Sequence, residues 1–367
     1  MTSVGIAIIG CGNISGTYLK AMLNFPVLNL LAVADLNLEA AKAKGAEFGI
    51  TARSIEDVLA DPEVEIVVNL TIPKAHAEIA TRTLNAGKHA YSEKPLALSY
   101  AEGQALLDLA KTVGLRVGAA PDTFLGGSHQ AVRALIDKGA IGQPIGGTAV
   151  FMCPGHESWH PNPDFYYDDG GGPMLDMGPY YLTALVNCFG SVTQVSGFAT
   201  MPRKQRVITS EPRYGEHIEV HVPTHVTGVA MFENGAVVQI CMSFDVAAHK
   251  HGPIELYGTE GTIIVPDPNF FGGDVQTFNK GDKEYTKLDA PTPYSDGEFR
   301  SIGVADMAFA IQSDRPHRAN GELALHVLEV MVAFQSAADD GAIIQIESRV
   351  ERPKSLSSSC TNGLLAK

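Results

Sequence analysis

The feature that most constrains the fold is a short apolar run, Val4–Ile9, which ends in a glycine-rich turn and leads into a helical pattern. In such a strand–turn–helix unit the first glycine permits the tight turn, and the second lets a pyrophosphate approach the backbone at the helix N-terminus. The third position needs only a small residue, and Ser15 is small. Such turns are common after strands, so the signal is weak alone. The candidate cofactor contacts are Gly10, Gly12, Asn13 and Ile14.

Asp35 strengthens this interpretation because it follows a second apolar run, residues 28–34, at about the 20-residue spacing expected of a dinucleotide site. A carboxylate there can accept hydrogen bonds from both ribose hydroxyls of NAD and would repel a 2′-phosphate. The alternative is that Asp35 only caps the helix that begins near Leu38. Strand, glycines and spacing agree on the ribose role, so NAD is predicted over NADP.

The first third of the chain alternates apolar runs with amphipathic segments, which is typical of βαβ units and a doubly wound parallel sheet. Ser54 with Asp57, and Ser99 with Glu102, have the spacing of helix N-caps. Strands are expected at residues 4–9, 28–34, 64–70, 89–92 and 115–119. An N-terminal Rossmann domain is therefore predicted for residues 1–121.

The pattern changes after about residue 120, and turn residues then separate short alternating runs. This predicts a C-terminal α+β domain, residues 122–367, with a large, mostly antiparallel open sheet. Helices are expected at residues 128–138 and 321–338, and a surface excursion at 266–298. Strands are expected at residues 194–200, 227–232, 236–244, 252–257 and 261–265.

Length and charge narrow the class of protein further. The 367 residues suit two domains, and a formal net charge of −14 argues against nucleic acid and anionic membranes as partners. No signal-peptide pattern or membrane-spanning apolar run is present. Five cysteines without CxxC spacing favour reduced thiols and hence a cytoplasmic protein. They are Cys11, Cys153, Cys188, Cys241 and Cys360.

A second informative segment runs from an expected strand into the sequence Glu93-Lys94-Pro95. In a doubly wound sheet, ligands bind beyond the carboxyl ends of the strands. Glu93 and Lys94 are therefore expected to point toward the cofactor crevice rather than to form an ordinary surface salt bridge.

A third segment places three glycines, residues 170–172, before a helical pattern that begins at Leu175. Asp176 and Tyr180 are four residues apart and so share one helix face. The helix dipole near its N-terminus should keep Asp176 ionised. Tyr181 faces elsewhere and is expected to be a core aromatic.

These segments together resemble the glucose–fructose oxidoreductase, inositol dehydrogenase and MocA family (Gfo/Idh/MocA). The resemblance runs from the glycine turn through Glu93-Lys94-Pro95 and the segment GGGPMLDMGPYY to Tyr257-Gly258-Thr259-Glu260-Gly261. It implies an NAD(P)-dependent oxidoreductase with a Rossmann domain and a second domain on a large open sheet, through which members form dimers or tetramers. It further implies cofactor contacts at Thr71, Pro73 and His76.

The resemblance also implies that Lys94 works beside a residue on the helix of Asp176. Many members carry histidine four residues after the aspartate, where this chain has Tyr180. Members similar to glucose–fructose oxidoreductase, dihydrodiol dehydrogenase and xylose dehydrogenase carry tyrosine there as well. The departure puts the usual histidine acid/base in doubt, but the substitution need not abolish catalysis.

The chemistry of a CH–OH oxidation assigns roles to these three residues. The hydroxyl proton must be removed while hydride leaves to the nicotinamide, and a tyrosine of pKa about 10 is a poor base unless a cation stabilises its phenolate. Tyr180 is therefore predicted to be the acid/base, Lys94 its activator and a hydroxyl anchor, and Asp176 an acceptor for a substrate hydroxyl. Lys94 as the proton carrier is the alternative.

Substrate contacts are predicted from a loop before the glycine run, which contains the only tryptophan of the chain. Aromatic and polar side chains together are typical of sugar sites, although a solvated capping loop is an equal alternative. The candidates in the loop are His156, Trp159 and His160, and Asp122, just past the last Rossmann strand, is a further one. No histidine pair has a clear third ligand, so no metal is expected.

We therefore predict an NAD-dependent dehydrogenase that acts on a sugar, which could be an aldose, a glycoside or a cyclitol. Two alternatives stay open. One is a redox-neutral, NAD-dependent enzyme that cleaves glycosides, and the other is a regulatory protein that senses NAD. Such regulators tend to lose the catalytic lysine, which this chain keeps as Lys94.

Overall fold

The computed structural model describes residues 2–288, 293–356 and 365. Its N-terminal part is a parallel sheet in the order β3-β2-β1-β4-β5-β6, with every neighbouring pair parallel. This is the strand order of a doubly wound dinucleotide-binding fold, and it confirms the predicted fold class. The strands are β1 (Val4–Ile9), β2 (Leu28–Ala34), β3 (Thr51–Arg53), β4 (Ile66–Asn69), β5 (His89–Ser92) and β6 (Val117–Ala119).

Helices on both sides of this sheet follow from local sequence signals. Ser54 accepts a hydrogen bond from the backbone N–H of Asp57, and Ser99 forms a full capping box with Glu102. Gly114 ends its helix in the left-handed conformation, at φ 69°. The helices are α1 (Ser15–Met22), α2 (Leu38–Phe48), α3 (Ile55–Ala60), α4 (His76–Asn85) and α5 (Tyr100–Val113), with short 3₁₀ turns η1 (Pro73–Ala75) and η2 (Thr123–Leu125).

The C-terminal part is a nine-stranded sheet in the order β16-β15-β14-β13-β7-β12-β11-β8-β17. Its pairs are antiparallel except for β12 and β7, which run parallel, so the sheet is mixed. The strands are β7 (Pro144–Met152), β8 (Val192–Thr200), β11 (His225–Phe232), β12 (Val237–Ser243), β13 (Ile254–Gly258), β14 (Gly261–Val265), β15 (Gln276–Asn279), β16 (Thr286–Lys287) and β17 (Ile344–Gln345).

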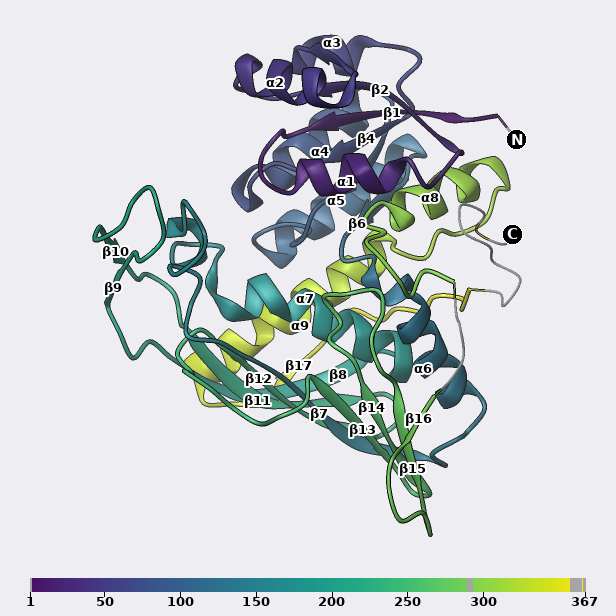
Figure 1. The fold of residues 1–367 in the computed structure, drawn as a ribbon. Coiled ribbons are helices and arrows are strands. Elements are labelled where there is room, and N and C mark those ends of the chain that lie inside the picture. Colours follow the sequence, from purple (N-terminus) through teal and green to yellow (C-terminus); the bar gives the residue numbers. More distant parts are fainter. Residues whose placement is uncertain (1, 289–292, 357–364, 366–367) are drawn as a thin grey trace.

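Helices α7 (Gly172–Phe189) and α9 (Gly321–Asp340) lie between the two sheets and cover one face of the larger one (Figure 1). Nearly all of α7 is buried. Helix α6 (Gly127–Asp137) packs beside α7, and the hairpin of β9 (Gln205–Val207) and β10 (His217–Glu219) stands apart from both sheets.

Helix α8 (Ile302–Gln312) was not predicted, because its residues 302–310 are all buried and show no polar stripe. It packs against β6, and α9 packs against both β6 and α5. Elements from the C-terminal half thus complete the edge of the N-terminal sheet, and the proposed boundary at residue 121 stays a prediction. No helix among the described residues is long and apolar enough to cross a membrane.

Candidate active site

The glycine turn after β1 is tight at Gly10 and open at Gly12. Gly10 has a φ of 107°, and a Cβ atom there would lie 2.5 Å from the backbone of Leu70, so only glycine fits. A Cβ on Gly12 would meet no atom within 4 Å, which leaves open space over the turn. The Ser15 hydroxyl donates to the Gly12 carbonyl oxygen at 2.7 Å, and this hydrogen bond holds the turn in place. Asn13 is exposed beside it, and Ile14 precedes α1.

Asp35 lies at the end of β2 and faces this turn. Its Oδ2 atom accepts the Cys11 N–H at 2.7 Å, and its Oδ1 atom accepts the Asn37 N–H at 2.8 Å. The N-cap of α2 is Asn37, not Asp35. The carboxylate is only half-buried, so it retains room for ribose hydroxyls.

The turn after β4 carries Thr71 and Pro73, and both are half-buried. His76, by contrast, is 1% exposed, and its ring nitrogens lie 3.0 Å from the Thr71 carbonyl oxygen and 2.7 Å from that of Pro95. Burial lowers the pKa of His76. The structure thus places His76 beneath the predicted cofactor surface, where it joins two turns.

Glu93 and Lys94 follow β5 at the same edge of the sheet. Glu93 is buried, and its carboxylate accepts the Tyr18 hydroxyl at 2.7 Å and the Lys94 backbone N–H at 2.9 Å. This carboxylate therefore orients the start of the loop, and it does not form a surface salt bridge.

Lys94 and Asp176 form a buried ion pair between the two parts of the chain. The Lys94 Nζ atom donates to Oδ1 of Asp176 at 2.7 Å and to its backbone oxygen at 2.8 Å, and both side chains are 15% exposed. Burial alone would lower the pKa of Lys94, but Asp176, Tyr180 and Glu93 raise it above its ordinary value. Burial would raise the pKa of Asp176, but the charge of Lys94 and the hydrogen bond from His156 hold it below its ordinary range. Both groups are therefore charged at neutral pH.

The start of α7 corrects one expectation about Asp176. The helix begins at Gly172, three residues before the predicted start, so Asp176 lies in its second turn. Asp176 thus depends less on the helix dipole than expected, and Lys94 is the main group that keeps it ionised.

Tyr180 lies on the same face of α7, and its ring centre is 5.2 Å from the Nζ atom of Lys94. The ring is 7% exposed. Burial raises the pKa of Tyr180, and the cations of Lys94 and Arg300 only partly offset this effect. Lys94 lowers the pKa of Tyr180, as expected from the sequence, but burial raises it by more. Tyr181 is 1% exposed and packs against Phe151, as expected of a core aromatic.

Arg300 is a site residue that the sequence analysis missed. Its guanidinium interacts with Tyr180, and it is held by Glu298 at 2.6 Å and by the side-chain oxygen of Asn269 at 2.8 Å. It precedes α8, 120 positions after Tyr180 in the sequence, and no motif marks it.

Two of the predicted substrate residues join this cluster and one is peripheral. The Nε2 atom of His156 lies 3.1 Å from Oδ2 of Asp176, and the Trp159 indole N–H donates to Nδ1 of His156 at 3.1 Å. The ring centres of His160 and Trp159 are 5.3 Å apart, and His160 interacts with Asp176 through its charge, with no hydrogen bond between them among those described.

Asp122 does not join the cluster. It is 1% exposed, and its Oδ2 atom accepts the backbone N–H groups of Ser301 and Gly303 at 3.1 and 2.9 Å. Its position just past the last Rossmann strand suggested a substrate contact, but the carboxylate instead holds the start of α8. The sequence could not show this because the partners are about 180 residues away.

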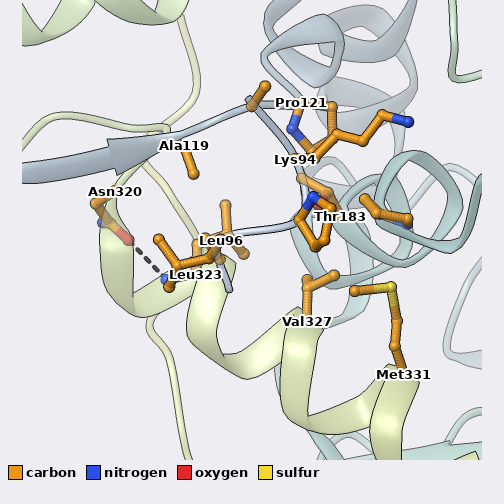
Figure 2. A pocket seen from close by; sticks show the side chains of 13 residues that line it. Lys94, Leu96, Ala119, Pro121, Thr183, Asn320, Leu323, Val327 and Met331 are labelled. Carbon is orange, nitrogen blue, oxygen red and sulfur yellow. Dashed lines mark hydrogen bonds between the residues drawn. The ribbon is translucent and has the colours of Figure 1, made fainter. Parts of the chain in front are cut away.

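A small pocket has Lys94 in its lining but neither Asp176 nor Tyr180. It is lined mainly by apolar side chains, and Figure 2 shows the Lys94 side chain directed away from Leu323, Val327 and Met331. The Nζ atom of Lys94 instead meets Asp176, which does not line this pocket. Among the described residues, no group of three or more metal-ligating side chains is found.

Comparisons with known proteins agree with this fold. A profile described as oxidoreductase family, NAD-binding Rossmann fold, matches residues 4–120, and one described as GFO/IDH/MocA C-terminal domain matches residues 129–264. The 1,5-anhydro-D-fructose reductase of Ensifer adhaerens is 24% identical over 349 residues, which cover 93% of this chain and 98% of the relative.

Two solved structures have the same fold over 95% of this chain and 100% of theirs, each with a TM-score of 0.83. They are an NAD binding oxidoreductase from Klebsiella pneumoniae at 23% identity and levoglucosan dehydrogenase in complex with NADH and L-sorbose at 20% identity. With both halves matched in order by the family's profiles, the chain belongs to the GFO/IDH/MocA family of oxidoreductases, whose N-terminal domain is an NAD-binding Rossmann fold.

Proposed function

We propose that the chain is an NAD-dependent dehydrogenase that transfers hydride between a CH–OH carbon of a sugar and the nicotinamide. The observation that carries the proposal is the meeting of Lys94, Asp176 and Tyr180 at the carboxyl end of β5. The glycine turn lies at the same edge of the sheet. The names of a sugar reductase and of a complex with L-sorbose among the similar proteins support a carbohydrate substrate, whether aldose, glycoside or cyclitol.

NAD would be held by Gly10, Gly12, Asn13 and Ile14 at the turn, and its ribose by Asp35. The open space at Gly12 fits a pyrophosphate, and the half-buried carboxylate of Asp35 disfavours a 2′-phosphate. Thr71 and Pro73 would line the same crevice. When bound, the nicotinamide accepts or supplies the hydride.

Tyr180 moves the proton in this proposal, and Lys94 anchors the reacting oxygen. Because burial raises its pKa, Tyr180 is a phenol at neutral pH and can give its proton to a carbonyl oxygen during reduction. Oxidation requires the phenolate and is favoured at alkaline pH. The raised pKa of Lys94 supports its role as a permanent hydrogen-bond donor over the alternative of a proton carrier. Asp176 holds Lys94 and offers its remaining lone pairs to a substrate hydroxyl.

We also propose a cellular location and an oligomeric state for the enzyme. Four free cysteines support a reducing, cytoplasmic setting, whereas Cys360 lies outside the described residues. The face of the large sheet away from α7 and α9 exposes Phe198, Val229, Met231 and Val237. This apolar face supports a homodimer or homotetramer formed through the sheet.

The test is absorbance at the NADH wavelength with purified protein. Pentoses, hexoses, inositols and glucosides are offered with NAD or NADP, and the corresponding keto sugars with NADH. NADH formation or consumption with at least one sugar is expected. Release of an aglycone without net NADH would favour the glycoside-cleaving alternative, and tight NAD binding without any turnover would favour the sensor.

A further inference from the structure

We infer that Trp159 and His156 form a positioning pair that keeps His156 uncharged and thereby reserves the Asp176 carboxylate for Lys94. The effect on turnover rests on the proposed function. The protonation of His156, however, can be measured without any substrate.

The hydrogen bonds assign both ring nitrogens of His156. An indole N–H can only donate, so the 3.1 Å contact from Trp159 requires Nδ1 of His156 to be an acceptor without a proton. The single proton of the neutral ring is then on Nε2, which donates to Oδ2 of Asp176 at 3.1 Å. Asp176 receives Lys94 on its other oxygen, Oδ1, at 2.7 Å.

The indole opposes the usual effect of a neighbouring carboxylate. A carboxylate beside a histidine favours the imidazolium form, in which both ring nitrogens carry protons. In this site a proton on Nδ1 would point at the Trp159 N–H, so His156 can be charged only after the indole hydrogen bond breaks. His156 is 8% exposed and Trp159 is 56% exposed, so the indole is the group that shields Nδ1, and its displacement costs this hydrogen bond.

Other groups pack closely around His156. The ring of Phe244 and that of Tyr166 in η3 (Asp164–Tyr166) pack against the His156 ring, with ring centres 4.5 and 4.4 Å from its centre. Burial raises the pKa of Tyr166 above its ordinary value, so it stays neutral. Phe151 of β7 is 6.5 Å away.

The backbone of His156 is fixed as well. Its N–H donates to the Tyr167 hydroxyl at 3.1 Å, and Tyr167 bonds to Glu157. Glu157 pairs with the buried Arg206 at 2.7 Å. Because this ion pair already satisfies Glu157, the charged groups that bear most directly on the ring are Asp176, Lys94 behind it, and His160 of the same loop.

The hydrogen bond from Trp159 therefore limits the positive charge that His156 can place beside Asp176. While His156 is neutral, the negative charge of Asp176 is left to hold the Lys94 ammonium. A charged His156 would compete with Lys94 for the same carboxylate and would loosen the group that anchors the reacting oxygen.

The test is ¹⁵N NMR of the histidine rings as a function of pH, in wild type, Trp159→Phe and Phe165→Leu. His156→Gln identifies the His156 signal. Wild-type His156 should show an unprotonated Nδ1 and a protonated Nε2 at neutral pH. Trp159→Phe removes the donor but keeps an aromatic ring, so at a given pH a larger share of His156 should carry a proton on Nδ1 than in the wild type. Phe165→Leu, on the same loop but without a bond to His156, should leave that share unchanged.

Turnover supplies a second measurement. Trp159→Phe should lose kcat at the pH values where Nδ1 of His156 becomes protonated and recover it at higher pH, whereas His156→Gln, which still has an N–H donor but cannot titrate, should not show this acid loss. An unchanged share of protonated Nδ1 in Trp159→Phe, or a protonated Nδ1 in the wild type at neutral pH, would overturn the inference. A loss of turnover that is equal at every pH would do so as well, since it indicates packing alone. If no sugar is turned over, the NMR result still decides the inference separately from the proposed function.

Discussion

The ammonium nitrogen of Lys94 lies 5.2 Å from the centre of the Tyr180 ring, although Lys94 follows a Rossmann strand and Tyr180 lies on a helix of the other sheet. At this distance a cation stabilises a developing phenolate. Asp176, which bonds to Lys94 and lies one turn before Tyr180 on the same helix, fixes the spacing. The site therefore exists only when the two sheets are docked.

Replacing Arg300 should shift the pH dependence of oxidation. Arg300 is the second cation that stabilises ionised Tyr180, so Arg300→Leu should raise the pKa of the phenol and lower the oxidation rate at mildly alkaline pH by roughly tenfold. Arg300→Lys keeps the charge and should recover part of the rate. The pH profile of kcat for both variants tests this, with thermal unfolding as a control for the lost contacts to Asn269. Identical profiles for wild type and Arg300→Leu would refute the role.

Replacing Asp35 should change the choice of cofactor. Asp35→Ser keeps a hydrogen-bonding group near the Cys11 N–H but removes the charge that opposes a 2′-phosphate. The ratio of kcat/KM for NAD to that for NADP should fall by at least about tenfold, which corresponds to roughly 1.4 kcal/mol. Glu39→Ser, which removes an exposed carboxylate from the first turn of α2, is the matched control and should leave the ratio unchanged. A constant ratio in Asp35→Ser would show that the ribose is held elsewhere.

The site could be predicted from the sequence only where local patterns carry it. The glycine turn, Asp35 and the spacing of Asp176 and Tyr180 are local, and the structure places each where its pattern indicated. Arg300, the partners of Asp122 and the parallel pairing of β7 with β12 depend on contacts between distant segments. Gly146 and Gly147 further weaken the strand pattern of β7, whose pairing leaves no room for a Cβ there.

Electrostatic effects of burial were also beyond sequence reasoning. The sequence indicated that Lys94 would lower the pKa of Tyr180, but it gave no measure of how deeply the ring is buried, and burial proves the larger effect. His76 shows the same limitation, since the family resemblance implied a cofactor contact, whereas its ring is enclosed.

Asp122 should make stability depend on pH. Burial raises its pKa to about 6 from an ordinary 3.8, so the folded state binds this proton more tightly than the unfolded state does. The stabilisation that this proton gives the folded state is complete below the pKa of Asp122 in the unfolded chain. It is lost as the pH rises through the pKa of about 6 that Asp122 has in the folded protein. Asp122→Asn keeps an oxygen acceptor for Ser301 and Gly303 but cannot titrate.

The free energy of unfolding of Asp122→Asn, relative to wild type, should therefore increase by roughly 2–3 kcal/mol between about pH 4 and pH 7.5. Urea unfolding at a series of pH values measures this difference. A difference that does not change with pH would mean that Asp122 titrates normally in the folded protein.

The turnover of Tyr180→Phe, measured beside its affinity for NAD, tests the central claim most directly. The substitution removes one hydroxyl from a ring that is 7% exposed, so packing is kept. We predict a kcat lower by about 10²–10⁴-fold, an NAD dissociation constant close to that of the wild type, and nearly normal turnover for Tyr181→Phe, the adjacent buried phenol. Turnover of Tyr180→Phe near the wild-type value would contradict the account.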